Sequence, residues 1–222
     1  MTPPPRYERG TSPSEWGGTL TVTDLSVRRG GRQVIDRLSF SLDAGQLLLL
    51  TGRNGSGKTS LLRALALLVP VSGGAIRWHG SNVGDDREAW HGRLAWLGHS
   101  DGLKGDLSAV ENLASAEHLR SGAEAARRDI DQALLAFDLP EIAQRPVRML
   151  SAGQRRRVAL ARVVLSKAPL WLLDEPLNAL DAPAQQLLIN ALVAHLAQGG
   201  MAIAATHAAL DVAGALKLEL AS

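Results

Sequence analysis

The stretch Gly45–Leu62, GQLLLLTGRNGSGKTSLL, decides how the rest of the chain is interpreted. Leu47–Leu50 is a short apolar run typical of a strand buried on both faces, and glycines then mark a turn before helical sequence resumes at Ser60. Residues 52–59 fit the pattern G-x-x-x-x-G-K-[ST], in which a glycine-rich loop lies between a strand and a helix. The sequence therefore predicts a loop that binds the phosphates of a nucleotide.

Each fixed position in this loop has a physical role in holding a phosphate tail. Glycines let backbone N–H groups approach phosphate oxygens without a Cβ in the way, and the positive end of the following helix adds to the attraction. Lys58 is placed to reach the β- and γ-phosphates, and the Thr59 hydroxyl to ligate Mg²⁺. The residues expected to contact the nucleotide are Gly52, Arg53, Asn54, Gly55, Ser56, Gly57, Lys58, Thr59 and Ser60.

The composition restricts the classes of function. The 222 residues suffice for one large α/β domain with a small insertion. The formal net charge is +2 and no block of like charge occurs, so nucleic-acid binding is not favoured. The chain has no cysteine, which excludes disulfides and thiolate chemistry. No apolar run approaches the ~18 residues of a membrane span, so we expect any membrane role to depend on a partner.

The N-terminal part divides into a leader and the start of a domain. Residues 1–18 are rich in proline and lack an apolar core, so we expect a flexible leader rather than a signal peptide. Residues 19–222 are expected to form one domain. Apolar residues alternate over Leu20–Leu42 around a Gly-Gly turn, which predicts two or three antiparallel strands.

An alanine-rich helical segment interrupts the core. We expect residues 107–148 to form an inserted helical subdomain. Ser108 and Glu111 have the spacing of a capping box, Gly122 separates two helices, and Pro146 ends the segment. Outside it, Pro70 and Gly73-Gly74 are expected to end the helix after the phosphate loop, the strands expected are 75–78, 93–98, 201–205 and 216–220, and a further helix is expected over 183–198.

The second informative region runs from Leu150 to Asp181. LSAGQ opens a helix with Ser151 at its N-cap. The apolar strand LWLL then ends at Asp174 and Glu175, an acidic pair expected where a metal-bound nucleotide meets a sheet edge. The helix is expected to bury Val158, Leu160, Ala161, Val164 and Leu165, and to carry Arg155, Arg156 and Arg157 mainly on its outer face, with phosphate contact as the alternative.

The phosphate loop, LSAGQ, the acidic pair and a late histidine, His207, occur in an order that resembles the ATP-binding subunits of ABC transporters, from about Leu20 to the end. LSAGQRRRVALAR and APLWLLDEPLNALD are similar to the CcmA type, the haem-exporter ATPases of cytochrome c maturation. The resemblance implies an α/β fold: a P-loop NTPase core with a mainly parallel sheet and flanking helices, an N-terminal antiparallel β subdomain and the inserted helical subdomain.

The resemblance also implies roles for individual residues in ATP hydrolysis. Two copies would pack head to tail, with each ATP between the phosphate loop of one copy and the signature of the other. Asp174 and Thr59 would hold Mg²⁺, Glu175 would act as the general base, and His207 would contact the γ-phosphate, with Lys58 assisting. The signature residues are Leu150, Ser151, Ala152, Gly153 and Gln154, and Asp181 would lie at the dimer interface.

The chain departs from the family pattern at three places. Ala152 replaces a glycine of the signature, which adds one methyl group. Arg29, beside Arg28, stands where the family has an aromatic residue that stacks on adenine; a guanidinium could stack there or remain solvated. Ser100, beside His99, stands in place of a glutamine, so we expect weaker coupling of ATP binding to subdomain rotation, with His99 or Ser100 acting through a water.

Partners and location are implied by the resemblance alone. They are integral membrane subunits of the CcmB/CcmC type, a peripheral position on the cytoplasmic face of a bacterial inner membrane, no direct haem binding and no nucleic acid. The alternatives are an ABC ATPase of another exporter, a soluble ABC-type switch on nucleic acid or ribosomes, and a nucleotide-binding module without turnover. Trp90 and Trp96 are expected to pack in the interior, and His79, His91, His118 and His195 to be ordinary solvated histidines.

Overall fold

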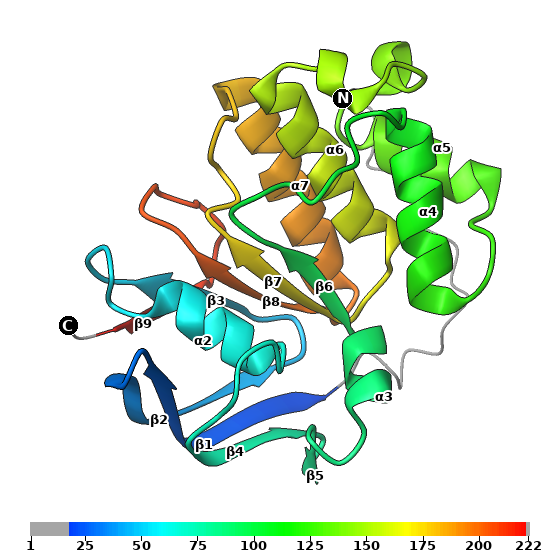
Figure 1. The fold of residues 1–222 in the computed structure, drawn as a ribbon. Helices are drawn as coiled ribbons and strands as arrows, with labels where there is room; N and C mark the ends of the chain where they lie inside the picture. The colour runs from blue at the N-terminus through cyan, green and yellow to red at the C-terminus, as the bar shows by residue number, and fades with distance from the viewer. Residues whose placement is uncertain (1–17, 221–222) are drawn as a thin grey trace.

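The computed structural model describes residues 18–220, so the expected leader lies outside the described residues apart from Gly18. The chain forms one four-stranded and one five-stranded sheet, with helices around them (Figure 1). In chain order the elements are β1 (Thr19–Arg29), β2 (Arg32–Asp43), β3 (Leu47–Thr51), α2 (Lys58–Leu65), β4 (Gly73–Trp78), β5 (Ser81–Asn82), α3 (Arg87–Gly92), β6 (Leu94–Leu97), α4 (Ala109–Ser121), α5 (Arg127–Leu135), η1 (Pro140–Ile142), η2 (Val147–Met149), α6 (Ala152–Leu165), β7 (Leu170–Asp174), α7 (Ala182–Ala197), β8 (Met201–Ala205) and β9 (Leu216–Glu219).

The smaller sheet is antiparallel, in the order β2-β1-β4-β5, which confirms the strand pattern expected at the N-terminus. Gly73 and Gly74 begin β4 instead of only ending the preceding helix. Gly74 has φ +83°, and a Cβ there would lie 2.4 Å from the carbonyl oxygens of Thr23 and Asp24. Glycine is therefore required where the start of β4 approaches the backbone of the neighbouring strand β1 closely.

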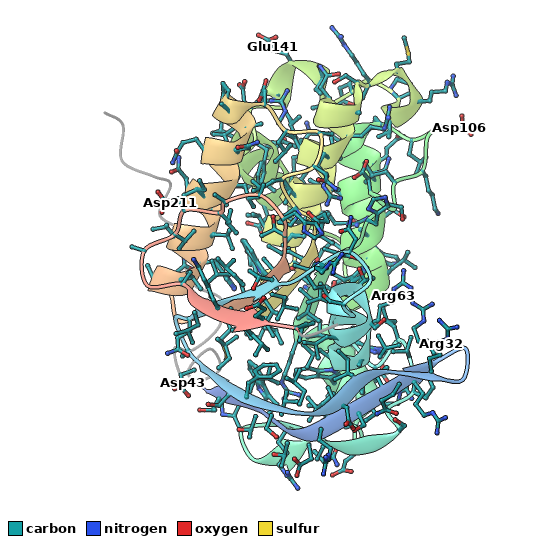
Figure 2. All side chains as sticks on the ribbon, turned by 90° about the vertical axis from the view of Figure 1, so that its left-hand side faces the viewer. Arg32, Asp43, Arg63, Asp106, Glu141 and Asp211 are labelled. Carbon is teal, nitrogen blue, oxygen red and sulfur yellow. The ribbon has the colours of Figure 1, made fainter. Side chains whose placement is uncertain are left out.

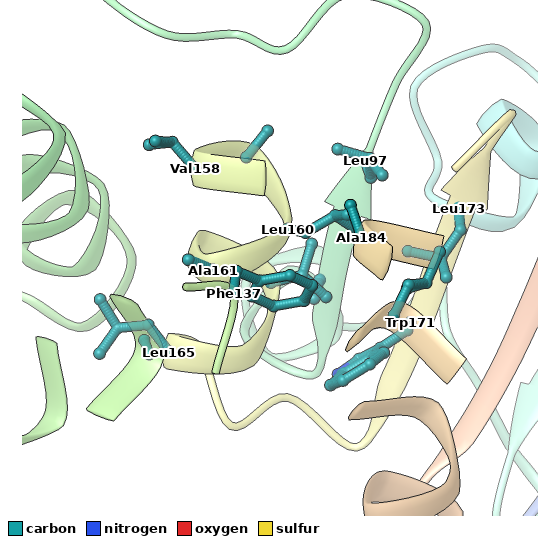
Figure 3. Close-up of a cluster of buried hydrophobic side chains, with 14 of the residues drawn as sticks. Leu97, Phe137, Val158, Leu160, Ala161, Leu165, Trp171, Leu173 and Ala184 are labelled. Carbon is teal, nitrogen blue, oxygen red and sulfur yellow. The ribbon is translucent and has the colours of Figure 1, made fainter. Parts of the chain in front are cut away.

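The larger sheet is parallel, in the order β6-β7-β8-β3-β9. Its strands β3, β7 and β8 are buried on both faces, whereas the edge strand β9 is largely exposed. Leu47 and Leu49 of β3 pack in the core shared with α6 and α7, and Leu48 and Leu50 pack in the core shared with α2 and the antiparallel sheet. A strand with two buried faces has no polar alternation, which is why LLLL reads as a continuous apolar run. Figure 3 shows Leu97 and Leu173 of this sheet in the same apolar cluster as Leu160 of α6 and Phe137.

Between β6 and α6 a loop leads into a segment made mainly of the helices α4 and α5. Ser108 caps α4 through the capping box with Glu111, and Gly122 ends α4 in the left-handed conformation at φ 70°. The Asn112 side chain accepts from the Lys104 N–H and donates to the carbonyl oxygens of Lys104, Leu107 and Ser108, so it fixes the loop that precedes the helix. In Figure 1, α4 and α5 lie beside α6, away from the antiparallel sheet.

Several expectations need correction. Helix α2 begins at Lys58 rather than at Ser60, and α3 was not expected; Asp86 caps it by accepting from the Ala89 N–H. His195 is buried and stacks on Trp171 with ring centroids 4.0 Å apart, because α7 lies on the sheet at that point.

Within residues 18–220 each helix is too short, or not apolar enough, to cross a lipid bilayer. Figure 2 shows Arg32, Asp43, Arg63, Asp106, Glu141 and Asp211 at the outline of the molecule.

Candidate functional site

The phosphate loop connects β3 to α2, at the carboxyl end of an interior strand of the parallel sheet. Gly57 is the N-cap of α2 at φ 99°, and a Cβ there would lie 2.9 Å from Ile35 Cδ1 and 3.1 Å from the Val34 carbonyl oxygen. The loop therefore needs glycine to pass β2. Lys58 is buried, and its Nζ donates to the carbonyl oxygens of Gly52 at 2.8 Å and Arg53 at 3.1 Å, so the ammonium is held over the loop.

The loop has the donor chemistry that a phosphate requires. Within the described part of the chain, the buried Ser56 hydroxyl has no hydrogen-bond partner. An unpaired buried hydroxyl is costly, and a phosphate oxygen would satisfy it. The helix α2 supplies the positive end of its dipole at the same place. The loop residues thus fit a bound triphosphate.

Thr59 and Asp174 come together from distant parts of the sequence. The Thr59 hydroxyl donates to Asp174 Oδ1 at 3.1 Å, and Asp174 is buried at the end of β7. No cluster of three or more histidine, aspartate or glutamate side chains capable of holding a metal is found among residues 18–220. A hydroxyl and one carboxylate fit Mg²⁺, which keeps several waters and takes further ligands from substrate phosphates.

Glu175 and His207 follow adjacent parallel strands, β7 and β8. Glu175 has φ 48°, in the left-handed region that costs a residue with a side chain roughly 1 kcal/mol, and its N–H donates to the Ala205 carbonyl at 2.8 Å. The His207 N–H donates to Glu175 Oε2 at 3.4 Å, and His207 Nε2 lies 3.4 Å from Glu175 Oε1. The left-handed backbone of Glu175 thus directs its carboxylate toward His207, at the carboxyl end of the sheet where Asp174 also lies.

The signature forms the start of α6. Ser151 is the N-cap of the helix: its hydroxyl accepts from the Gln154 N–H, and the Gln154 side chain accepts from the Ser151 N–H. A Cβ on Gly153 would lie 2.8 Å from the Ala179 carbonyl oxygen, so this glycine allows the turn after Glu175 to contact α6. Asp181 of that turn caps α7 by accepting from the Ala184 N–H at 3.0 Å.

The structure brings only part of the expected site together within one chain. Helices α2 and α6 cover opposite faces of the parallel sheet (Figure 1), and Ser151 and Ala152 are exposed at the start of α6. Arg29 is exposed at the end of β1, and Arg28 donates to the Gly31 carbonyl at 3.0 Å. His99 and Ser100 are exposed in the loop after β6.

The expected outer position of the three arginines is wrong for Arg156. Its side chain is 3% exposed and donates to the carbonyl oxygens of Asp174 at 2.9 Å and Glu175 at 2.6 Å. Charged side chains on a helix usually face solvent, which is why the sequence pattern did not predict the burial of Arg156. The available signal was its spacing from Ala159, Leu160 and Val163, which places it on the buried stripe of the helix.

Comparison with known proteins identifies the family that this chain matches. Residues 35–178 match the family model described as ABC transporter. The chain is 46% identical to the "Cytochrome c biogenesis ATP-binding export protein CcmA" of Paramagnetospirillum magneticum, over 91% of this chain and 94% of that protein. It is 43% identical to the protein of the same name from Nitrosococcus oceani, over 91% of this chain and 92% of that protein.

Solved structures show the same fold. An ABC transporter ATP-binding protein from Pyrococcus furiosus has a TM-score of 0.79 at 23% identity, and the match covers 91% of this chain and 97% of that one. An ATP-binding subunit of an ABC transporter has a TM-score of 0.76 at 24% identity, and the match covers 85% of this chain and 79% of that one. At these identities the likeness shows the arrangement of elements and no more.

Proposed function

Because this chain belongs to the ABC transporter family, as one of its ATP-hydrolysing subunits, we propose that it couples ATP-driven closure of a homodimer to membrane subunits in cytochrome c biogenesis. The observation that carries the proposal is the convergence of Lys58, Thr59, Asp174, Glu175 and His207 at one edge of the parallel sheet. The biological process is taken from relatives that share more than two-fifths of the residues over nine-tenths of the chain.

The residues of the chain account for most of the chemistry. Lys58 and the N–H groups of the phosphate loop bind the β- and γ-phosphates and offset their charge. Glu175 accepts the proton of the attacking water, and His207 contacts the γ-phosphate and keeps that water in line. Thr59 and Asp174 would hold Mg²⁺, which would neutralise negative charge on the phosphates. Phosphoryl transfer is mainly positioning and charge stabilisation, so rigid placement by strand ends suits it.

We propose that the second half of the site comes from another copy of the chain. The exposed start of α6 offers a serine cap and the positive end of a helix, which together can hold a γ-phosphate bound to the partner copy. Asp181 would lie at the same interface, in the turn that contacts Gly153 through Ala179. The exposed Arg29 would stack on the adenine of the ATP that is held by the phosphate loop of the same copy.

The membrane partner is proposed to be a set of integral subunits of the CcmB/CcmC type on the cytoplasmic face of a bacterial inner membrane. Leu119 of α4 is 79% exposed and Met149 is 70% exposed, and both belong to the helical part of the chain. We propose these two side chains as contact positions for the membrane subunits. Haem, as cargo, would pass through these subunits, and we propose that neither haem nor nucleic acid binds this chain.

Co-purification tests this function. The full chain is expressed in a bacterium with its membrane subunits and recovered from detergent-solubilised membranes, with ATPase activity measured on the purified complex. The expected result is recovery with small integral membrane proteins that stimulate Mg²⁺-dependent ATP hydrolysis. Recovery with RNA alone, lost as salt is raised, would instead support a soluble nucleic-acid switch.

A further inference from the structure

The guanidinium of Arg156 connects the ends of two parallel strands. One terminal nitrogen donates to the carbonyl oxygens of Asp174 and Glu175, at 2.9 and 2.6 Å, where β7 ends. The other donates to the Gly98 carbonyl at 3.0 Å and to Asp101 Oδ1 at 3.1 Å, in the loop after β6. A single planar side chain therefore holds both strand ends in fixed relative positions.

The same loop is attached to α6 at a second point. Arg162 donates to the carbonyl oxygens of Asp101 at 3.0 Å and Gly102 at 2.8 Å. Ser100, which stands where the family has a glutamine, is exposed in this loop. Arg156 and Asp101 thus connect the loop after β6 to Asp174 and Glu175.

Stability alone does not explain a charge at this position. The Arg156 side chain is 3% exposed, and that of Asp101, with which it forms an ion pair, is 25% exposed. The Arg156 Nε–H has no hydrogen-bond partner within residues 18–220. Replacing such a buried pair with apolar side chains is often neutral or stabilising, so an incompletely satisfied one points to another role.

We propose that Arg156 is a positioning residue for Glu175, and that with Asp101 it transmits movement of the loop after β6 to the strained backbone of that carboxylate. Glu175 has φ 48°, a conformation that persists only where surrounding contacts hold it. The hydrogen bond that Arg156 donates to the Glu175 carbonyl oxygen is such a contact. The inference rests on the proposed role of Glu175 as general base.

The test compares two substitutions on neighbouring residues of one helix. Arg156→Lys keeps the charge but loses the planar fork. Arg157→Lys is the matched control, because Arg157 also donates to two carbonyl oxygens, those of Phe137 and Asp138, which lie away from the strand ends. Each full-length variant is assayed for kcat, KM for ATP, equilibrium binding of MgATP and thermal unfolding, alone and with the membrane subunits.

We expect Arg156→Lys to lower kcat roughly 10- to 100-fold, with binding of MgATP within about twofold of wild type, since a small displacement of a catalytic group has this effect. Arg157→Lys is expected to leave kcat within about twofold. A kcat of Arg156→Lys equal to that of Arg157→Lys would overturn the inference, as would an equal loss of kcat and binding. Wild-type turnover tests the proposed function separately.

A second variant keeps the inference testable if Arg156→Lys does not fold. Asp101→Asn changes a partly exposed residue and removes the ionic partner while conserving shape. It should lower kcat several-fold and reduce stimulation by the membrane subunits, with MgATP binding unchanged. If both single variants fold, the double variant should have the kcat of Arg156→Lys alone, because the two residues act in sequence. Unchanged kcat and stimulation in Asp101→Asn, or independent multiplication of the two effects, would contradict the proposal.

Discussion

The Nε2 atom of His207 lies 3.4 Å from Oε1 of Glu175, and the backbone N–H of the same histidine donates to Oε2. The two residues are 32 positions apart and meet because β7 and β8 are adjacent and parallel, with Asp174 opposite Ala205. Strand β7 ends one residue before Glu175, and β8 ends two residues before His207. The sheet register therefore fixes the carboxylate and the imidazole as a pair.

Replacement of Glu175 by glutamine should separate binding from turnover. The amide keeps the size of the side chain but cannot accept a proton from water, so we expect ATP binding to persist while kcat falls about 100-fold or more. Single-turnover hydrolysis and binding of MgATP measure the two effects. Glu141→Gln changes an exposed glutamate and serves as the control. Wild-type turnover by Glu175→Gln would show that another group is the base.

The contact between Thr59 and Asp174 predicts a specific dependence on Mg²⁺. Thr59→Val removes the hydroxyl that lies 3.1 Å from Asp174 Oδ1 while keeping the branched shape. We expect the Mg²⁺ concentration for half-maximal hydrolysis to rise roughly tenfold, and chelation by EDTA to stop wild-type turnover. Thr23→Val, on the exposed side of β1, is the control. Equal Mg²⁺ requirements in both variants would remove Thr59 from the metal site.

Gly153 should tolerate no side chain. A Cβ there would lie 2.8 Å from the carbonyl oxygen of Ala179, a backbone atom that cannot rotate away. We expect Gly153→Ala to lower the free energy of unfolding by about 1–3 kcal/mol and to prevent ATP-dependent dimerisation. At Gly105 a Cβ would meet Arg148 Cβ at an ordinary 3.6 Å, so Gly105→Ala is the control. Urea unfolding and gel filtration with ATP measure both effects, and a Gly153→Ala protein that matches this control in both would contradict the prediction.

Much of the fold could be predicted from local patterns. The LLLL run, the Gly-Gly turn and the serine caps of α4 and α6 are set by neighbouring residues, and each is found where it was expected. The capping interactions involve residues three positions apart, so sequence spacing is enough to identify them. Element boundaries were less certain, as the start of α2 at Lys58 shows.

The rest depends on contacts between distant segments. Arg156 is buried where carbonyl oxygens of Gly98, just after β6, and of Asp174 and Glu175, at the end of β7, converge on it, and no local pattern contains those acceptors. The left-handed backbone of Glu175 is likewise held by the Ala205 carbonyl on the next strand. His195 was expected to be solvated, yet α7 presses it against Trp171. Contacts with distant segments thus determine the burial of Arg156 and His195 and the backbone conformation of Glu175.

The burial of His195 predicts a loss of stability in mild acid. Burial is the main cause that lowers the pKa of His195 to about 4, although the Met201 carbonyl, 3.0 Å from Nε2, acts to raise it. The unfolded chain binds a proton near pH 6.5, well before the folded chain does. Stability from this residue is therefore present above pH 6.5 and is lost as the pH falls toward 4.

Urea unfolding at pH 7 and pH 5 measures this effect. From the two pKa values we expect His195 to account for about 2 kcal/mol of the stability lost between these conditions. His195→Phe keeps a flat ring against Trp171 and cannot be protonated, so its stability should fall by about that much less over the same interval. His118→Phe, at an exposed position of α4, should lose as much stability as wild type. If His195→Phe and wild type show the same pH dependence, His195 is protonated equally in the folded and unfolded chains, and the stacked pair is open to water.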